Sequence, residues 1–256
     1  MLRYILLILF VVIIHNTNAQ KLKKHTESYG KFKEVYYADK KTKFRNGESF
    51  VINTETKDTL SRGNYENGKR VGKWTFRQGK SGVDYMIYDY SSDSLLYLNQ
   101  KLVADTFLVK TANGFEVEKV DRPAIYIGYT NEIQNELTKQ ILNVDQMRRG
   151  LQGMLIMTYR IDTLGNLSRA KVIMELDKSI VMEIDRSIHK LPGSFLPAIR
   201  NGKPVESAIY VRLNVIKMDD PQDRYVPLAP AAYVYDILCQ YGVSTRIVEQ
   251  KVIRRM

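Results

Sequence analysis

The clearest pattern in the chain is an alternation of hydrophobic and polar positions between residues 153 and 174. A period of two is typical of a β-strand with one buried face. The alternation stops at Asp162–Asn166 and resumes from Leu167 to Met174. Gly165 lies in this interruption and is free to adopt the positive φ angle of a tight turn. The two stretches therefore predict a β-hairpin. One face of its first strand consists of Leu155, Met157, Tyr159 and Ile161.

Hydrophobic residues on either side of this hairpin recur at helical spacing. Before it, Asn131 and Gln134 form a capping-box pattern at the start of a short amphipathic stretch. After it, Asp177 occupies an N-cap position, and Pro192–Gly193 ends the helical pattern. A last alternating strand follows a tight turn at Asn201–Gly202. The apolar positions are Ile133, Leu137 and Ile141 in the first helix, Ile180, Val181, Ile184, Ile188 and Leu191 in the second, and Ile209, Val211, Leu213 and Val215 in the strand.

The N-terminal half predicts short β-hairpins. The segment Phe44–Gly47 (F-R-N-G) recurs as Tyr65–Gly68 (Y-E-N-G). An aromatic residue two positions before Asn-Gly is typical of a strand that enters a type I′ turn. The second copy belongs to the pattern G-x-Y-x-N-G-K-x-x-G-x-W-x-F from Gly63 to Phe76, which resembles a MORN-type repeat, in which short hairpins stack into a sheet. We expect its aromatic residues to pack in a core, together with Tyr88.

The C-terminal half resembles the C-terminal domain of the TonB family, the energy transducers of the Gram-negative envelope. The resemblance rests on the order helix, strand, strand, helix, strand and on two signatures. These are G-x-L-x-M-x-Y-x-I-D-x-x-G-x-L from Gly153 and F-x-P-A-x-x-N-G-K-P-V from Phe195. Together with the hairpins they predict the α+β class. The expected division is a MORN-like antiparallel β domain at 20–120, a TonB C-terminal-like domain at 121–218 and a C-terminal extension at 219–256. In the extension, the sequence predicts a helix from Pro230 to Tyr241 and a strand from Thr245 to Ile253.

The resemblance implies a protein-binding site on the last strand. In the family, an extended segment of an outer-membrane receptor adds as a further strand beside it, so that main-chain hydrogen bonds supply affinity. The implied partner is an envelope protein, with an outer-membrane receptor segment as one candidate. Alternatively the strand is purely structural, and the strand expected at 245–253 covers its edge. The implied partner-binding residues are Ala208, Ile209, Tyr210, Val211, Arg212, Leu213, Asn214 and Val215.

The first residues predict export. Arg3 precedes an apolar run from Tyr4 to Ile14, and small or polar residues lead up to Ala19, as in a cleaved signal peptide. The run is shorter than the roughly 20 apolar residues that a membrane-spanning helix needs. We therefore expect a signal peptide at 1–19 and a mature protein in the periplasm or outer envelope. Two alternatives stay open: an energy-transducing protein with a retained N-terminal anchor, and a structural envelope scaffold without a transport role.

Charge and candidate chemistry narrow the function further. The formal net charge is +11, which in an exported protein indicates either a solvated charged surface or weak contact with an anionic membrane surface, rather than nucleic-acid binding. Cys239 is the single cysteine, so an intramolecular disulfide is impossible. His25 and His189 lack a second His or Cys at metal-ligand spacing. Since no set of nucleophile, base and orienting group can be assembled, we expect no enzyme, no cofactor and no metal.

Overall fold

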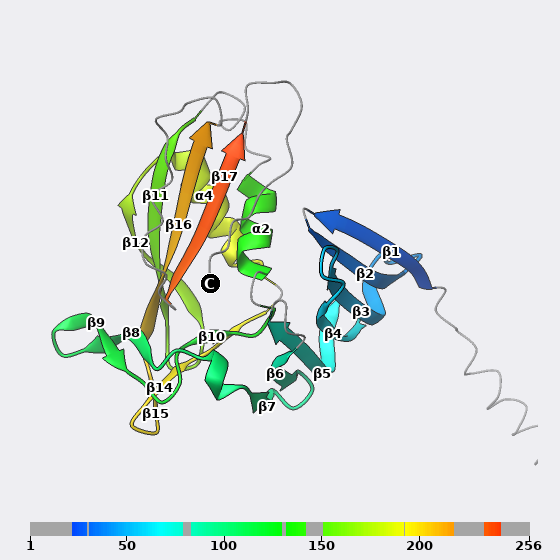
Figure 1. Ribbon diagram of the computed structural model, residues 1–256, viewed down its shortest axis with the longest axis horizontal. Coiled ribbons are helices and arrows are strands. Elements are labelled where there is room, and N and C mark those ends of the chain that lie inside the picture. The colour runs from blue at the N-terminus through cyan, green and yellow to red at the C-terminus, as the bar shows by residue number, and fades with distance from the viewer. Residues whose placement is uncertain are drawn as a thin grey trace, which may run out of the picture.

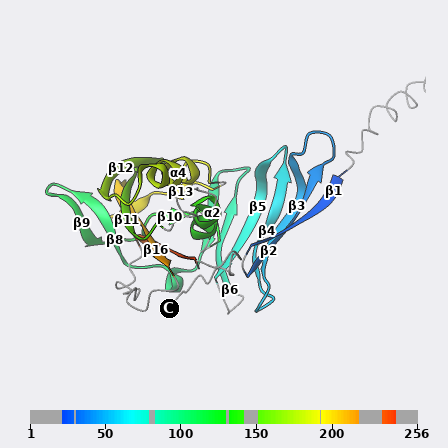
Figure 2. The same cartoon turned by 90° about the horizontal axis from the view of Figure 1, so that it is seen from above.

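The computed structural model of the protein describes residues 22–29, 31–78, 83–129, 132–141, 151–191, 193–217 and 233–241. Within these ranges, 60% of the residues lie in β-strands and 11% in α-helices. An N-terminal antiparallel meander is followed by a second sheet, and two helices pack on one face of that second sheet (Figure 1). One of these helices, α2, lies on the side of the second sheet that faces the meander (Figure 2).

The meander pairs each strand with its neighbour in sequence, from β1 to β7. The strands are β1 Leu22–Tyr29, β2 Phe32–Asp39, β3 Arg45–Asn53, β4 Thr59–Glu66, β5 Lys69–Gln78, β6 Val83–Asp89 and β7 Ser94–Leu98. Asn67 and Gly68 have φ angles of 50° and 82°, which confirms the tight turn predicted between β4 and β5.

The turn predicted at Asn46–Gly47 is wrong, because both residues lie inside β3. The chain reverses earlier, where the carboxylate of Asp39 accepts hydrogen bonds from the backbone of Lys41 and Thr42 at 2.8 and 2.7 Å. The register between β2 and β3 then shifts, so that residues 46–48 oppose the single residue Tyr37. Asn-Gly therefore forms a bulge here, the other common use of a glycine with positive φ.

The expected aromatic core of the meander is confirmed. Tyr65, Trp74, Phe76 and Tyr88 are all buried. A Cβ atom at Gly63 would lie 2.2 Å from the Trp74 indole, so only glycine leaves room for the ring at this position of the repeat pattern. Ile125, Ile127, Tyr129 and Leu196, which follow the meander in sequence, complete this core. The two sheets are therefore joined through shared hydrophobic packing.

The second sheet has the strand order β12-β11-β16-β8-β9, and β17 pairs with β16. Its strands are β8 Thr106–Thr111, β9 Gly114–Lys119, β11 Gly153–Ile161, β12 Leu167–Met174, β16 Ser207–Lys217 and β17 Val234–Tyr241. The helices are α2 Glu132–Ile141, α4 Lys178–Ile188 and the short 3₁₀ helix η2 Gln100–Leu102. Four short strands form two further pairs, β10 Ile125–Tyr126 with β13 Phe195–Leu196 and β14 Ala198–Arg200 with β15 Lys203–Val205.

Several elements of this region are confirmed as predicted. The hairpin β11–β12 turns at Gly165, which has a φ of 87°. Helix α4 begins after Asp177, whose carboxylate accepts a hydrogen bond from the backbone of Ser179 at 2.8 Å. Asn201 and Gly202 both have positive φ in the turn between β14 and β15. The predicted apolar faces of β11 and β16 are buried against the two helices.

The expected α+β class, with a TonB C-terminal-like domain of helices and strands, is wrong. The described residues are mostly antiparallel β, and their two α-helices have only 10 and 11 residues. The β8–β9 hairpin, which the sequence assigns to the repeat domain, instead joins the second sheet at the pair Val109–Ser207. The second sheet therefore contains more strands than the sequence patterns predict.

The predicted helix from Pro230 to Tyr241 is also wrong over its described part, since Val234–Tyr241 forms β17. Valine, tyrosine and isoleucine favour strands, and the edge of β16 offers a row of main-chain partners. Pairing with a distant strand therefore outweighs the local preference. The strand predicted at Thr245–Ile253 and the signal peptide predicted at 1–19 lie outside the described residues.

Candidate functional site

All the predicted partner-binding residues lie in β16, and β16 is paired on both sides. On one side it runs antiparallel to β11, from Ser207–Ile161 to Val215–Gly153. On the other side it runs parallel to β17, from Tyr210–Val234 to Lys217–Tyr241. The edge expected to receive a partner is thus occupied by a strand of the same chain.

The side chains of β16 divide between the two faces of the sheet. Ile209, Val211, Leu213 and Val215 point into the core under the helices and are buried. Tyr210, Arg212 and Asn214 alternate with them on the opposite face. The structure thus keeps the predicted residues together in one strand. Of their side chains, those of Tyr210, Arg212 and Asn214 lie on the face away from the helices.

Arg212 connects β16 to β17 through a buried ion pair. Its side chain is 7% exposed, and its Nε and Nη2 donate to the two carboxylate oxygens of Asp236. The Asp236 side chain is 31% exposed. A two-bond pair between a guanidinium and a carboxylate is strong and directional. Since a buried charge without a partner is costly, Arg212 favours the position of β17 seen here.

Apolar and main-chain contacts at the start of β17 add to this pair. The backbone N–H of Tyr210 donates to the carbonyl of Tyr233 at 2.7 Å. The Tyr233 ring lies edge-on to Phe107, with centroids 6.1 Å apart. Ile237 is 1% exposed and belongs to the core. Sequence reasoning missed Tyr233, Asp236 and Ile237 because it assigned them to a helix, although Tyr233, Tyr235 and Ile237 show a period of two.

Two polar side-chain atoms of β16 have no hydrogen-bond partner among the residues that the structure describes. The Ser207 hydroxyl and the Asn214 side-chain Nδ2 are buried and unbonded. Most buried polar atoms in proteins form hydrogen bonds, so these two unbonded atoms are exceptions. For Asn214, the residue opposite on β17 is Leu238.

A second polar cluster lies between the meander and α2. Arg70 of β5 pairs with Glu132 of α2 at 2.5 Å, and both side chains are less than 10% exposed. Arg70 also donates to the Tyr90 hydroxyl at 3.0 Å and lies over the Trp74 ring, 4.6 Å from its centroid. Arg70, Trp74 and Glu132 border a cavity of about 260 Å³, which Ser49 and Ser61 also line.

Arg70 and Glu132 each affect the pKa of the other. Burial alone would lower the pKa of Arg70, but the charge of Glu132 raises that pKa well above its usual value. Burial raises the pKa of Glu132, against the opposing effect of Arg70. Because each partner compensates the other in a buried setting, the pair joins the meander to α2 and has a structural role.

The two histidines singled out in the sequence lie next to other side chains. The ring of His25 stacks on Tyr36 at a centroid distance of 5.3 Å, and His189 Nε2 lies 3.9 Å from Asp185. Among the described residues, no group of three or more His, Cys, Asp and Glu side chains is arranged to hold a metal ion. In the same part of the chain, no helix has the length and apolar character needed to cross a membrane. The expected lack of enzymatic activity, cofactor and metal stays a prediction.

Comparison of the chain with family models, curated proteins and solved structures gave no match. The resemblances to the TonB family and to MORN-type repeats therefore stay predictions. What can be argued about function comes from the geometry of β16 and β17.

Proposed function

We propose that this chain is an exported envelope protein that binds an extended segment of a partner protein by strand addition to β16. In this proposal, β17 is the strand that the partner replaces. The observation that carries it is the position of β17, a parallel strand that pairs with β16 and is joined to it by the Arg212–Asp236 ion pair. Because its main-chain bonds repeat along the whole strand, another extended segment can form the same ladder.

The core of the second sheet depends less on β17 than on β11 and β16. The four core-facing residues of β16 are buried, whereas Ile237 is the one fully buried side chain between Tyr233 and Ile237. Without β17, the antiparallel strands β12, β11 and β16 would still pair with one another and share a core with α4, whereas α2 would lose its packing against β17. Parallel pairing is also slightly less stable per residue than antiparallel pairing. Release of β17 therefore costs less than release of β11 or β16.

Export places the partner in the cell envelope, where a segment of an outer-membrane receptor is one candidate. The support is the signal-peptide pattern of residues 1–19. N-terminal sequencing of the mature protein, combined with fractionation, tests this part. We expect a mature chain that begins at Gln20 in the periplasmic or outer-envelope fraction. An intact Met1 in the inner membrane would support the anchored alternative instead.

Strand exchange is tested by weakening the interaction between β17 and β16 in the full chain. In Asp236→Arg, two positive charges face each other across the β16–β17 pair, which disfavours the closed position. The probe is a fluorescent peptide with the sequence of residues 233–241. We expect the variant to bind this peptide at least about tenfold more tightly than the wild type, since loss of a charged hydrogen-bonded pair exceeds 1.4 kcal/mol.

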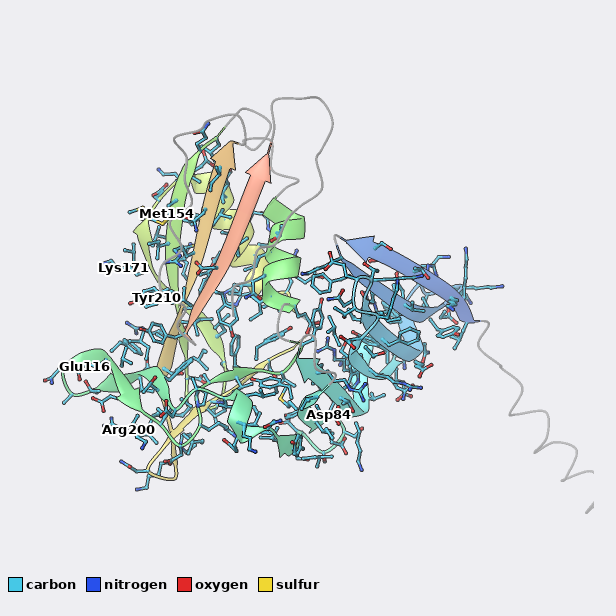
Figure 3. The ribbon with its side chains drawn as sticks, viewed as in Figure 1. Asp84, Glu116, Met154, Lys171, Arg200 and Tyr210 are labelled. Carbon is cyan, nitrogen blue, oxygen red and sulfur yellow. The ribbon has the colours of Figure 1, made fainter. Side chains whose placement is uncertain are left out.

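Two control variants separate strand release from general damage. Asp84→Arg breaks the exposed Arg77–Asp84 pair of the meander, 2.8 Å long, and should leave peptide binding unchanged. Asp84 lies far from Tyr210 and β16 (Figure 3). The double variant Arg212→Glu with Asp236→Arg restores opposite charges and should return peptide binding toward the wild-type level. If Asp236→Arg binds the peptide no better than the wild type, β17 is a permanent strand and the structural scaffold becomes the better account.

A further inference from the structure

We infer that the partner segment runs parallel to β16 and carries an acidic residue opposite Arg212 and a hydrogen-bond acceptor two residues later, opposite Asn214. Because it concerns the segment that takes the place of β17, this partner chemistry rests on the proposed function. Two side chains of β16 carry it. Arg212 is paired with Asp236, and Asn214 has a buried Nδ2 atom without a hydrogen-bond partner among the described residues.

The acidic position follows from the burial of Arg212. This guanidinium is held by both carboxylate oxygens of Asp236. A segment with a neutral residue in that place would leave a buried charge without its partner, which is strongly unfavourable. Its two donors also match a carboxylate better than a single carbonyl oxygen. Arg212 therefore discriminates against neutral and basic segments, and the net charge of +11 favours the approach of acidic ones.

The acceptor position follows from Asn214. Among the residues that the structure describes, its buried Nδ2 atom has no hydrogen-bond partner, and the register places Asn214 opposite Leu238. A partner segment with an acceptor at this position gains a hydrogen bond from the Asn214 side chain. This gain matters because β17 is tethered and has the high effective concentration of an intramolecular strand. A separate segment must bind better than β17 to replace it, and Asn214 offers a place to do so.

The position between these two must be apolar. It lies opposite Leu213, on the face that points toward the helices, where Ile237 is buried. The partner pattern is therefore acidic, apolar, acceptor, of which Asp-Ile-Asn is an example. On β17 the corresponding residues are Asp236, Ile237 and Leu238, so the strand of the chain itself meets two of the three requirements.

The experiment measures the affinity of three peptides for the full chain carrying Asp236→Arg. The peptides have the sequence of residues 233–241, unchanged, with Asp236→Asn, or with Leu238→Asn. Relative to the unchanged peptide, we expect the first substitution to weaken binding at least about tenfold and the second to tighten it about fivefold, as measured by fluorescence anisotropy. Adding Arg212→Ala to the chain should remove the difference between the acidic peptide and its neutral form.

The outcomes separate this partner chemistry from the proposed function. Equal binding of the acidic and neutral peptides would overturn the role of Arg212 while strand exchange stands. No gain with the Leu238→Asn peptide would overturn the role of Asn214. If none of the peptides binds the opened chain, strand exchange is wrong and the inferred partner pattern falls with it.

Discussion

In the described part of the chain, two arginines with side chains less than 10% exposed pair with carboxylates, one in each sheet region. Arg70 has Glu132, the Tyr90 hydroxyl and the Ile127 carbonyl as partners, and its guanidinium lies over Trp74. Arg212 pairs with Asp236 on the neighbouring strand β17. Burial of a charge therefore does not by itself define its role. The number of elements that hold it decides whether the pair is fixed or exchangeable.

The two ion pairs also differ in the position of their strands within the sheets. Arg70 lies in β5, between β4 and β6, and its acidic partner begins a helix that packs in the other core. Asp236 lies in a strand that pairs with β16 at the side of the second sheet. Loss of the first pair therefore disturbs the contact between two cores, whereas loss of the second frees one strand.

The largest effect is expected for Arg70→Met. The substitution leaves the buried Glu132 without its cation, which typically costs about 3–5 kcal/mol of unfolding free energy. Urea unfolding of the full chain measures this loss. The matched control is Arg62→Met, which removes an exposed ion pair with Glu48 and should cost at most about 1 kcal/mol. Equal losses in the two variants would show that the Arg70 pair does not join the two regions.

A smaller effect is expected in the alkaline range. Burial raises the pKa of Tyr85 in β6 from 10.0 to about 12. Because the folded pKa lies above the unfolded value, this group contributes stability below pH 10 that is lost as the pH rises toward 12. Unfolding free energies measured from pH 9 to 12 should therefore decline, and Tyr85→Phe should make that decline shallower. Tyr97→Phe, at a position 43% exposed, serves as the control. An unchanged decline in Tyr85→Phe would contradict the assignment.

The sequence predicts those elements that are determined by residues close together in the chain. The β11–β12 hairpin follows from alternation and Gly165, helix α4 from the Asp177 cap, and the β4–β5 turn from Asn67–Gly68. Each depends on hydrogen bonds or backbone angles within a few residues, so the local pattern contains the necessary information.

The elements that sequence reasoning missed depend on distant partners. Asp236 lies 24 residues from Arg212, and Glu132 lies 62 residues from Arg70. Neither pairing has a local signal. The assignment of Val234–Tyr241 to a helix failed for the same reason, because the edge of β16 decides the conformation of β17. The α+β class was wrong because strands formed by such pairing raise the share of β-structure.

Hydrogen exchange on the full wild-type chain tests the central claim most directly, namely that β17 is released while the rest of the fold stays intact. We expect the amides of β17 to exchange through a local opening, faster than those of β11 and of the central meander strands β4 and β5. The amides of β16 that face β17 should exchange with it. If β17 is instead as well protected as β11 and exchanges only through global unfolding, it is a permanent part of the sheet, and strand addition at β16 is contradicted.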